Sequence, residues 1–209
     1  MSKQDVLNEV WGIPQKTKGN CYVFALAPET RKGGYHKKRL HKARPGDKCE
    51  RFQNESFDFQ NCTDIVKRIL CDNPTNVKKV ERKSKNMQLN DNYHLMAAYL
   101  SPGYGKGEGT DFHFLRRMPL TSVANSWSKF KHNTPMKCVD QLLTTQPKYC
   151  WVHQRGWSKG GPLLHDASGN LILDPEMADM NYRSVNYKIF CGLFLVKTRS
   201  ATVTSRYDM

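Results

Sequence analysis

The sequence YHLMAAYL at residues 93–100 is an apolar run, and DFHFLR at residues 111–116 alternates between polar and apolar side chains. Continuous apolar runs and period-two alternation are typical of buried and half-buried β-strands. The glycine-rich stretch GYGKGEG at residues 103–109 lies between them and favours a hairpin-like connection. It lacks the Gly-Lys pair followed by Ser or Thr of a phosphate-binding loop, so we do not expect nucleotide binding.

Three more segments of the second half have strand character. Each is short and rich in apolar residues, and turn-forming residues separate it from its neighbours. They are Tyr149–His153, Asn170–Leu173 and Ile189–Val196. Together with the first two strands, these segments predict an antiparallel sheet.

The first half of the chain favours helices. Residues 4–11 carry apolar side chains at helical spacing, and a second apolar run of at most two turns follows Asn20, which is placed as an N-cap. The clearest helix runs from about Cys62 to Leu70, with one apolar stripe and Asn61 as its cap. Helices first and an antiparallel sheet afterwards predict an α+β fold, in which the N-terminal helices pack on the sheet.

Length and composition exclude several classes of protein. A chain of 209 residues buries enough surface to fold as one compact domain, and we expect a single domain over residues 1–209. No apolar run reaches the roughly 20 residues of a membrane span. The first residues also lack the apolar stretch of a signal peptide, so we expect a chain made in a cytosol-like compartment.

The net charge of +14 predicts attraction to polyanions. The stretch at residues 31–44 holds seven basic residues and no acidic one, and a second basic run follows Pro74. Each run is either a solvated loop or a docking site for an acidic protein or membrane surface. Nucleic acid is less favoured, because aromatic residues are rarely interleaved with the basic ones. The candidate partner-binding residues are Arg31, Lys37, Lys38, Arg39 and Trp127.

The seven cysteines are an odd number, widely spread and without a C-x-x-C pair. This pattern predicts neither a disulfide framework nor a zinc site, which usually takes its ligands in close pairs. We expect most of the cysteines to pack as small hydrophobic side chains, including Cys62 on its helical stripe. No metal or cofactor is expected.

Cys21 is the cysteine whose position suggests chemistry. It stands at the start of a short buried helix, where free N–H groups favour a thiolate, and every histidine of the chain follows it. His113, in the predicted strand at residues 111–116, is the first candidate for its base. A histidine in an alternating strand is more often a structural group, so both interpretations stay open.

An ordered series of motifs resembles a family of uncharacterised proteins encoded by giant DNA viruses and some phages. The motifs are NCYVFAL at 20–26, RPGD at 44–47, CDNP at 71–74, DFHFLRR at 111–117, GWSKGG at 156–161, DASGNLILDP at 166–175 and NYKIFCGLF at 186–194. The resemblance covers most of the chain. The series is far more specific than any one motif.

The Cys-then-His order of this family is similar to that of papain-like peptidases and amidases. The resemblance implies a papain-like or related scaffold with Cys21 as nucleophile and His113 as base. It also implies Asp166 or Asp174 as the carboxylate that orients the imidazole. One position departs from the family pattern, because Lys159 stands where relatives carry the histidine of Trp-Ser-His-Lys. A lysine ammonium cannot accept a thiol proton, so this departure argues against catalysis.

Two segments differ in character from the rest of the chain. The segment at about 118–156 is longer than the family pattern, and we expect either a docking surface that includes Trp127 or a helical excursion packed on the sheet. The tail at 198–209 is polar, with little to bury. We therefore expect the tail to be dispensable for folding and to act in assembly.

Two functions are consistent with these observations. The first is a virion structural protein, a minor capsid component on an inactive papain-like scaffold, which is assembled in the host cytoplasm and bridges several neighbouring capsid subunits. The second is a cysteine hydrolase, a peptidase or amidase, with Cys21 as nucleophile and His113 as base. Lys159 and the inserted segment favour the first.

Overall fold

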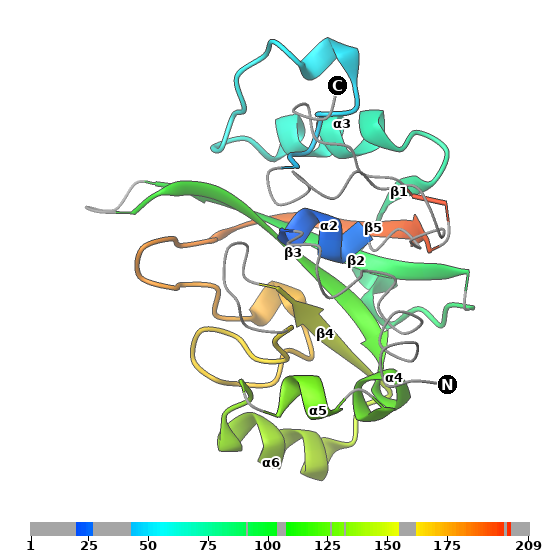
Figure 1. Cartoon of the computed structure of the whole chain (residues 1–209), viewed down its shortest axis with the longest axis vertical. Coiled ribbons are helices and arrows are strands. Elements are labelled where there is room, and N and C mark those ends of the chain that lie inside the picture. Colours follow the sequence, from blue (N-terminus) through cyan, green and yellow to red (C-terminus); the bar gives the residue numbers. More distant parts are fainter. Residues whose placement is uncertain are drawn as a thin grey trace.

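A computed structural model describes residues 20–26, 43–90, 92–103, 108–125, 127–131, 133–154, 162–198 and 200–201. Its centre is a five-stranded antiparallel sheet with the strand order β1-β5-β2-β3-β4. The strands are β1 (Val77–Val80), β2 (Tyr93–Pro102), β3 (Thr110–Pro119), β4 (Tyr149–His153) and β5 (Ile189–Lys197). Figure 1 shows this sheet across the middle of the molecule, between α3 above and α4 to α6 below.

The helices are short, and most of them flank the sheet. The α-helices are α2 (Cys21–Leu26), α3 (Cys62–Asp72), α4 (Leu120–Asn125), α5 (Trp127–Phe130) and α6 (Met136–Thr145), and the 3-10 helices are η2 (Glu50–Phe52), η3 (Arg82–Asn86) and η4 (Pro175–Met177). None of the helices in the described part of the chain combines the length and the apolar composition that a membrane span requires. Mixed helices and an antiparallel sheet confirm the α+β class.

The sequence patterns located most of these elements. Four of the five predicted strands form within a few residues of the expected bounds, and so do the helix after Asn20 and the helix that begins at Cys62. Asn61 caps α3 as predicted, because its side chain accepts a hydrogen bond from the Thr63 N–H at 2.8 Å. The helix expected at residues 4–11 lies outside the described residues.

Two strand assignments were wrong. The predicted strand Asn170–Leu173 is an irregular segment with one isolated bridge, between Leu171 and His165. The Asp166 carboxylate folds this segment into a tight loop, because it accepts hydrogen bonds from the N–H groups of Ser168 and Asn170. The strand that was missed is β1, whose two lysines made it resemble part of a basic run.

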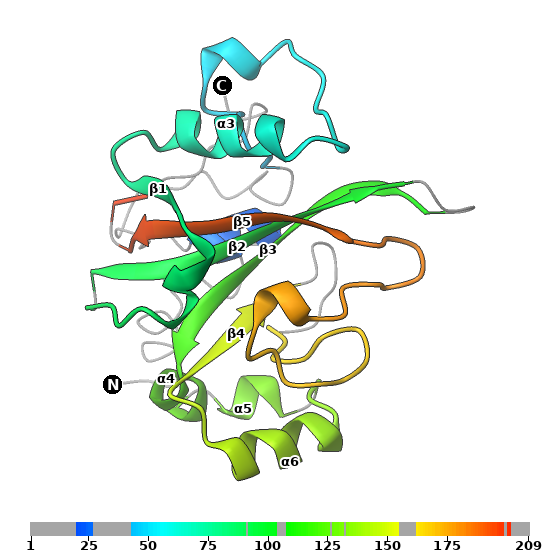
Figure 2. The same cartoon turned by 180° about the vertical axis from the view of Figure 1, so that it is seen from behind.

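The two faces of the sheet are both covered, by different elements. On one face, α2 and α3 form a core with Phe112, Phe114 and Phe194, and α4 to α6 form an adjoining core with Met118 and Val152. The other face is covered by the chain between β4 and β5, which includes η4. Figure 2 shows η4 on the side of the sheet that faces away from α2.

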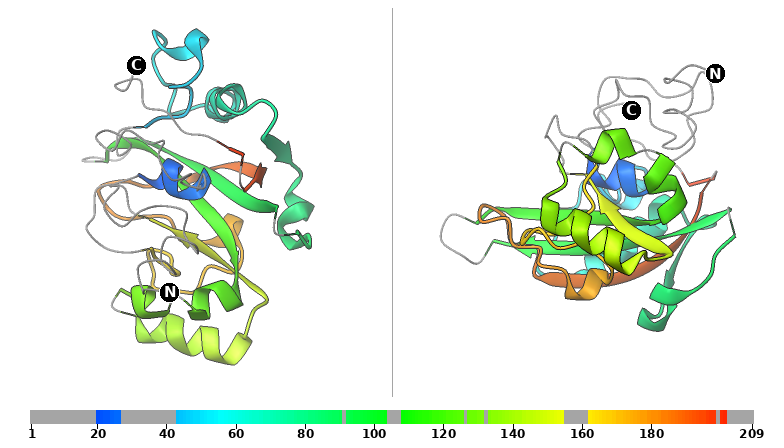
Figure 3. Two further views of the ribbon diagram at one scale, coloured as in Figure 1. Left: turned by 45° about the vertical axis from the view of Figure 1, so that its right-hand side comes forward. Right: turned by 90° about the horizontal axis from the view of Figure 1, so that it is seen from below.

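The inserted segment at about 118–156 contributes α4, α5, α6 and β4. In the left view of Figure 3 the three helices lie together at one end of the molecule, and in the right view, seen from below, they lie in front of the sheet. Phe130 is fully buried there, and Trp127 is half-buried against the same core. The helices therefore pack on the sheet as a helical excursion, which was one of the two interpretations of this segment.

The cysteine interpretation requires a correction. Cys49 is bonded to Cys71, and Cys62 is bonded to Cys191, so four of the seven cysteines form disulfides. The two bonds attach α3 at both ends, to the chain before η2 and to β5. Spacing along the sequence misled the prediction, because both pairs are close in space but 22 and 129 residues apart in the chain.

The C-terminal tail was expected to have little to bury, but its first residues contact the core. Ala201 is 1% exposed and belongs to the core with α2 and α3. His94 contacts the Thr198 hydroxyl at 3.2 Å, and Asn76 donates to the Ser200 carbonyl at 2.9 Å. Thr198, Ser200 and Ala201 therefore contact the folded core, and the remainder of the tail lies outside the described residues.

Candidate functional site

Cys21 occupies the first position of α2, as the sequence predicted. Asn20 begins the helix, because its side chain accepts a hydrogen bond from the Val23 N–H at 3.2 Å and its carbonyl accepts one from the Phe24 N–H at 3.0 Å. All six residues of α2 are buried. A helix this short has its position fixed by packing, so the location of Cys21 depends on the core beneath α2.

The Cys21 thiol is enclosed. Its side chain is 4% exposed, and Sγ contacts the carbonyl oxygen of Phe112 at 3.6 Å. Burial, together with the negative charge of Asp111, raises the pKa of the Cys21 thiol well above its ordinary value. The expected activation by free N–H groups at the helix start is therefore outweighed, and the thiol stays protonated at neutral pH.

His113 lies on the opposite side of the sheet from Cys21. Phe112 and Phe114 of β3 pack in the same core as Cys21, whereas His113 lies between them in the strand and pairs with Tyr99 across β2. Successive side chains of a strand point to opposite faces. The His113 ring accordingly stacks on Tyr187 in the other layer, with ring centroids 4.8 Å apart.

His113 and His153 form a buried imidazole pair. The Nε2 atom of His113 lies 2.8 Å from the Nδ1 atom of His153, and the Nε2 atom of His153 lies 2.9 Å from the carbonyl oxygen of His165. A carbonyl only accepts, so His153 donates from Nε2, and in the neutral ring its Nδ1 accepts the proton of His113 Nε2. The Nε2 proton of His113 is thereby engaged with a second imidazole.

Tyrosines and a carboxylate extend this polar cluster. Tyr187 donates a hydrogen bond to Asp111 Oδ2 at 2.7 Å, and the hydroxyl of Tyr182 lies 3.5 Å from His153 Nε2. Burial and the Asp111 charge raise the pKa of Tyr187 far above its usual range, and burial raises the pKa of Asp111. The phenol of Tyr187 therefore remains a hydrogen-bond donor throughout the physiological pH range.

The two predicted orienting carboxylates contact backbone groups. Asp166 accepts hydrogen bonds from the N–H groups of Ser168, Asn170 and Asp179 at 3.0, 2.9 and 3.1 Å. Asp174 caps η4 by accepting the Glu176 N–H at 3.1 Å. The contacts of Asp166 are thus those of a loop-forming residue. Cys21, His113 and Asp166 are not brought together as a triad.

The predicted partner-binding residues divide into two groups. Trp127 is half-buried against the core of α4 to α6. Arg31, Lys37, Lys38 and Arg39 lie outside the described residues, as does Lys159. Within the described ranges, no group of three or more His, Cys, Asp or Glu side chains is arranged to hold a metal ion.

Sequence reasoning missed the partners of His113. His153 ends a strand that was predicted, but its pairing with His113 depends on the register of β3 and β4, in which Leu115 lies opposite His153. Asp111 and Tyr187 belong to motifs quoted above, and nothing in their spacing indicates that they touch. Comparisons with family models, with curated proteins and with solved structures give no match to this chain.

Proposed function

We propose that this chain is a structural protein of a large icosahedral DNA virus, a minor capsid component on a papain-like or related scaffold without catalytic activity. In this role it is assembled in the host cytoplasm and bridges neighbouring capsid subunits in the virion. The observation that carries the proposal is the enclosed thiol of Cys21, which faces a backbone carbonyl while His113 stacks on Tyr187 in the opposite layer.

A cysteine hydrolase needs a thiol that substrate can reach and an imidazole that accepts its proton. The Cys21 side chain is 4% exposed and its pKa is raised, so neither access nor ionisation favours attack. The imidazole pair is held by its own hydrogen bonds. These features support a scaffold without catalytic activity.

The charge distribution supports an acidic partner. Lys78 and Lys79 are both exposed on β1, the strand at one edge of the sheet, and neither has an ion-pair partner among the described residues. With a net charge of +14, such a surface attracts acidic faces of several capsid neighbours or an acidic membrane surface. Nucleic acid ranks lower, because this edge carries lysines without an interleaved aromatic residue.

Thiol labelling tests the absence of catalysis. The native protein is treated with iodoacetamide at pH 8, and the modified cysteines are located by mass spectrometry. We expect Cys21 to react more than about 100-fold more slowly than in the unfolded chain, with the same rate in His113→Asn. Rapid modification of Cys21 that is lost in His113→Asn would overturn the proposal and favour the hydrolase.

Cross-linking in purified virus particles tests the structural role. We expect the protein in the particles, with cross-links from Lys78 and Lys79 to acidic segments of more than one capsid chain. Lys78→Glu with Lys79→Glu should reduce its incorporation, whereas the matched double change Lys131→Glu with Lys137→Glu, at exposed positions near α5 and α6, should not. A protein that is abundant in infected cells but absent from particles would contradict the proposal.

A further inference from the structure

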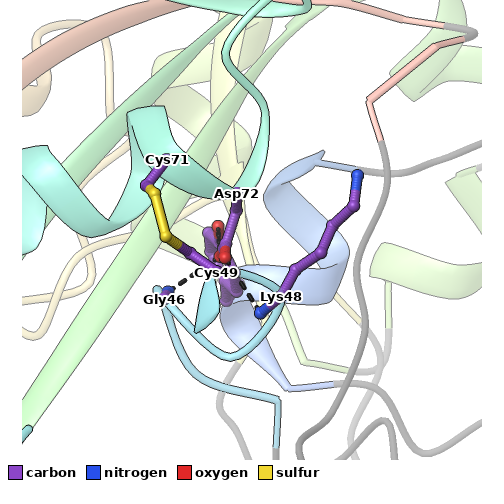
Figure 4. Close-up of a disulfide and its surroundings, with 6 residues drawn as sticks. Gly46, Lys48, Cys49, Cys71 and Asp72 are labelled. Atoms are coloured by element: carbon purple, nitrogen blue, oxygen red, sulfur yellow. Dashed lines mark hydrogen bonds between the residues drawn. A yellow bond between two sulfur atoms is a disulfide. The ribbon is translucent and has the colours of Figure 1, made fainter. Parts of the chain in front are cut away.

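Hydrogen bonds hold together the two chain segments that the Cys49–Cys71 disulfide joins. Cys71 is in the last turn of α3, and the next residue, Asp72, is 3% exposed. The Asp72 carboxylate accepts hydrogen bonds from the Gly46 and Lys48 N–H groups at 2.8 and 3.0 Å. Figure 4 shows these two contacts beside the bond between the sulfur atoms. Asp72, the residue after Cys71, therefore holds the turn that leads into Cys49.

Other contacts also hold this turn against α3. Gly46 has a φ of +95°, and a Cβ atom there would lie 3.0 Å from the side chains of Arg68 and Phe52. The Arg68 guanidinium lies over the Phe52 ring at 4.5 Å and donates to the Ser56 carbonyl at 2.7 Å. These interactions do not involve sulfur. They position Cys49 beside Cys71 whether or not the disulfide is formed.

We propose that Cys49 and Cys71 form a reversible redox lock on α3, closed and opened by thiol–disulfide exchange in the folded protein, with Asp72 as the positioning residue. For closure, the thiolate of one cysteine attacks a low-molecular-weight disulfide, forms a mixed disulfide and releases one thiol. The thiolate of the other cysteine then displaces the second thiol. Two protein thiols are oxidised, and one external disulfide is reduced to two thiols that take up the two protons.

The second disulfide has a different environment. Cys191 is 5% exposed and packs in the core with α2 and α3, and Cys62 is half-buried against the same core. Cys49 and Cys71 are both half-buried, and neither belongs to that core. Thiol exchange requires access to a sulfur atom. Both residues of Cys49–Cys71 are half-buried, whereas one of the two residues of Cys62–Cys191 is fully buried, so a reductant opens Cys49–Cys71 first and Cys62–Cys191 keeps the N-terminal end of α3 attached.

The folded state survives the opening of the lock. Ile65 and Ile69 are fully buried in the core, and the Arg68 side chain pairs with Asp64 at 2.8 Å. Tyr22 of α2 also donates a hydrogen bond to Asp72 at 2.8 Å, which ties the end of α3 to α2. Opening Cys49–Cys71 therefore removes the covalent bond between α3 and the chain before η2 without unfolding the sheet.

The test equilibrates the native protein in glutathione buffers of increasing reduced fraction, followed by acid quenching, alkylation and mass spectrometry of each cysteine pair. We expect Cys49–Cys71 to open at a value of [GSH]²/[GSSG] at least about tenfold lower than that which opens Cys62–Cys191. The near-ultraviolet circular dichroism should stay native at the intermediate stage. Opening of both pairs together, or only with loss of the native spectrum, would overturn the lock.

Asp72→Asn tests the positioning role. It should lower the equilibrium constant for closing Cys49–Cys71 by about tenfold, because one oxygen acceptor is lost, and should leave Cys62–Cys191 unchanged in the same molecule. Asp140→Asn, at an exposed position of α6, is the matched control. An unchanged Cys49–Cys71 constant would refute the role of Asp72. If Asp72→Asn does not fold, Tyr22→Phe replaces it, with an expected shift of about threefold and the same criterion.

Discussion

The two faces of β3 are equally buried but chemically different. On one face, Phe112 and Phe114 pack with Cys21 in an apolar core, whereas on the other His113 belongs to a cluster of imidazoles and phenols. Neighbouring residues of β3 therefore lie in two different environments. A cysteine and a histidine can therefore lie on adjacent elements and still belong to different layers, because strand geometry assigns alternate side chains to opposite faces.

The largest expected effect comes from removing a core ring from the apolar face. Phe114 is fully buried and lies 4.9 Å from the Tyr22 ring, measured between centroids. Phe114→Ala should lower the free energy of unfolding by about 3–5 kcal/mol, because apolar contacts are lost and a cavity remains. Urea denaturation followed by tryptophan fluorescence measures this loss.

Leu115→Ala is the matched change on the other face, where Leu115 is equally buried. We expect a loss of about 2–5 kcal/mol from it. If either substitution cost less than about 1 kcal/mol, that face of β3 would not be core.

A smaller effect is expected from the imidazole pair. His153 is fully buried, and His153→Ala leaves both the His165 carbonyl and the His113 Nε2–H without this partner. We expect a loss of about 2–4 kcal/mol in the free energy of unfolding. His153→Gln, which retains a donor for the carbonyl, should lose less. Equal stability of the two variants would show that the hydrogen bond to His165 contributes nothing.

The pH dependence of Asp72 is the next effect in size. Burial raises the pKa of Asp72 from 3.8 to about 6, against the hydrogen bonds that favour its ionised form. The folded chain therefore binds this proton more tightly than the unfolded chain. The contribution of Asp72 to stability is fully present below about pH 4 and is lost as the pH rises through about 6, by an amount of the order of 2 kcal/mol.

Carbon NMR of the Asp72 carboxyl group measures this titration directly, and the midpoint should lie near 6. Urea denaturation at several pH values should show that Asp72→Asn removes this part of the pH dependence. A midpoint near 4 would mean that the three hydrogen bonds outweigh the burial of the carboxylate.

The smallest effect is expected at the sheet edge. Lys78 and Lys79 are exposed, and changing both to alanine should alter the free energy of unfolding by no more than about 0.5 kcal/mol. Thermal unfolding of the double variant beside the unsubstituted chain measures this change. A loss above about 1 kcal/mol would show that the two lysines support the fold.

The sequence predicts local structure well where a single pattern determines it. The period of residues 111–116 located β3, and Asn61 with the apolar stripe after Cys62 located α3. It failed for β1, because a four-residue edge strand with two lysines has neither an apolar run nor a long alternation. A sequence pattern therefore predicts a strand or a helix only when the element is long enough for its buried face to produce a repeat of apolar residues.

Long-range relations could not be read in the same way. The partner of Cys62 is 129 residues away, and no spacing rule identifies it. The separation of Cys21 from His113 depends on which face of β3 carries α2, and the pairing of His113 with His153 depends on the register between β3 and β4. Both are properties of the assembled sheet. Motif order alone made Cys21 and His113 look like a pair.

The two disulfides overlap along the chain, because Cys62 lies between Cys49 and Cys71 while its own partner is Cys191. Every peptide bond from Cys49 to Cys191 is therefore spanned by at least one covalent bridge. A protease that cuts once anywhere in this interval produces two fragments that remain one molecule until a reductant is added. In the oxidised protein, a nick in a loop of this region would leave the two fragments joined and the mass of the molecule almost unchanged.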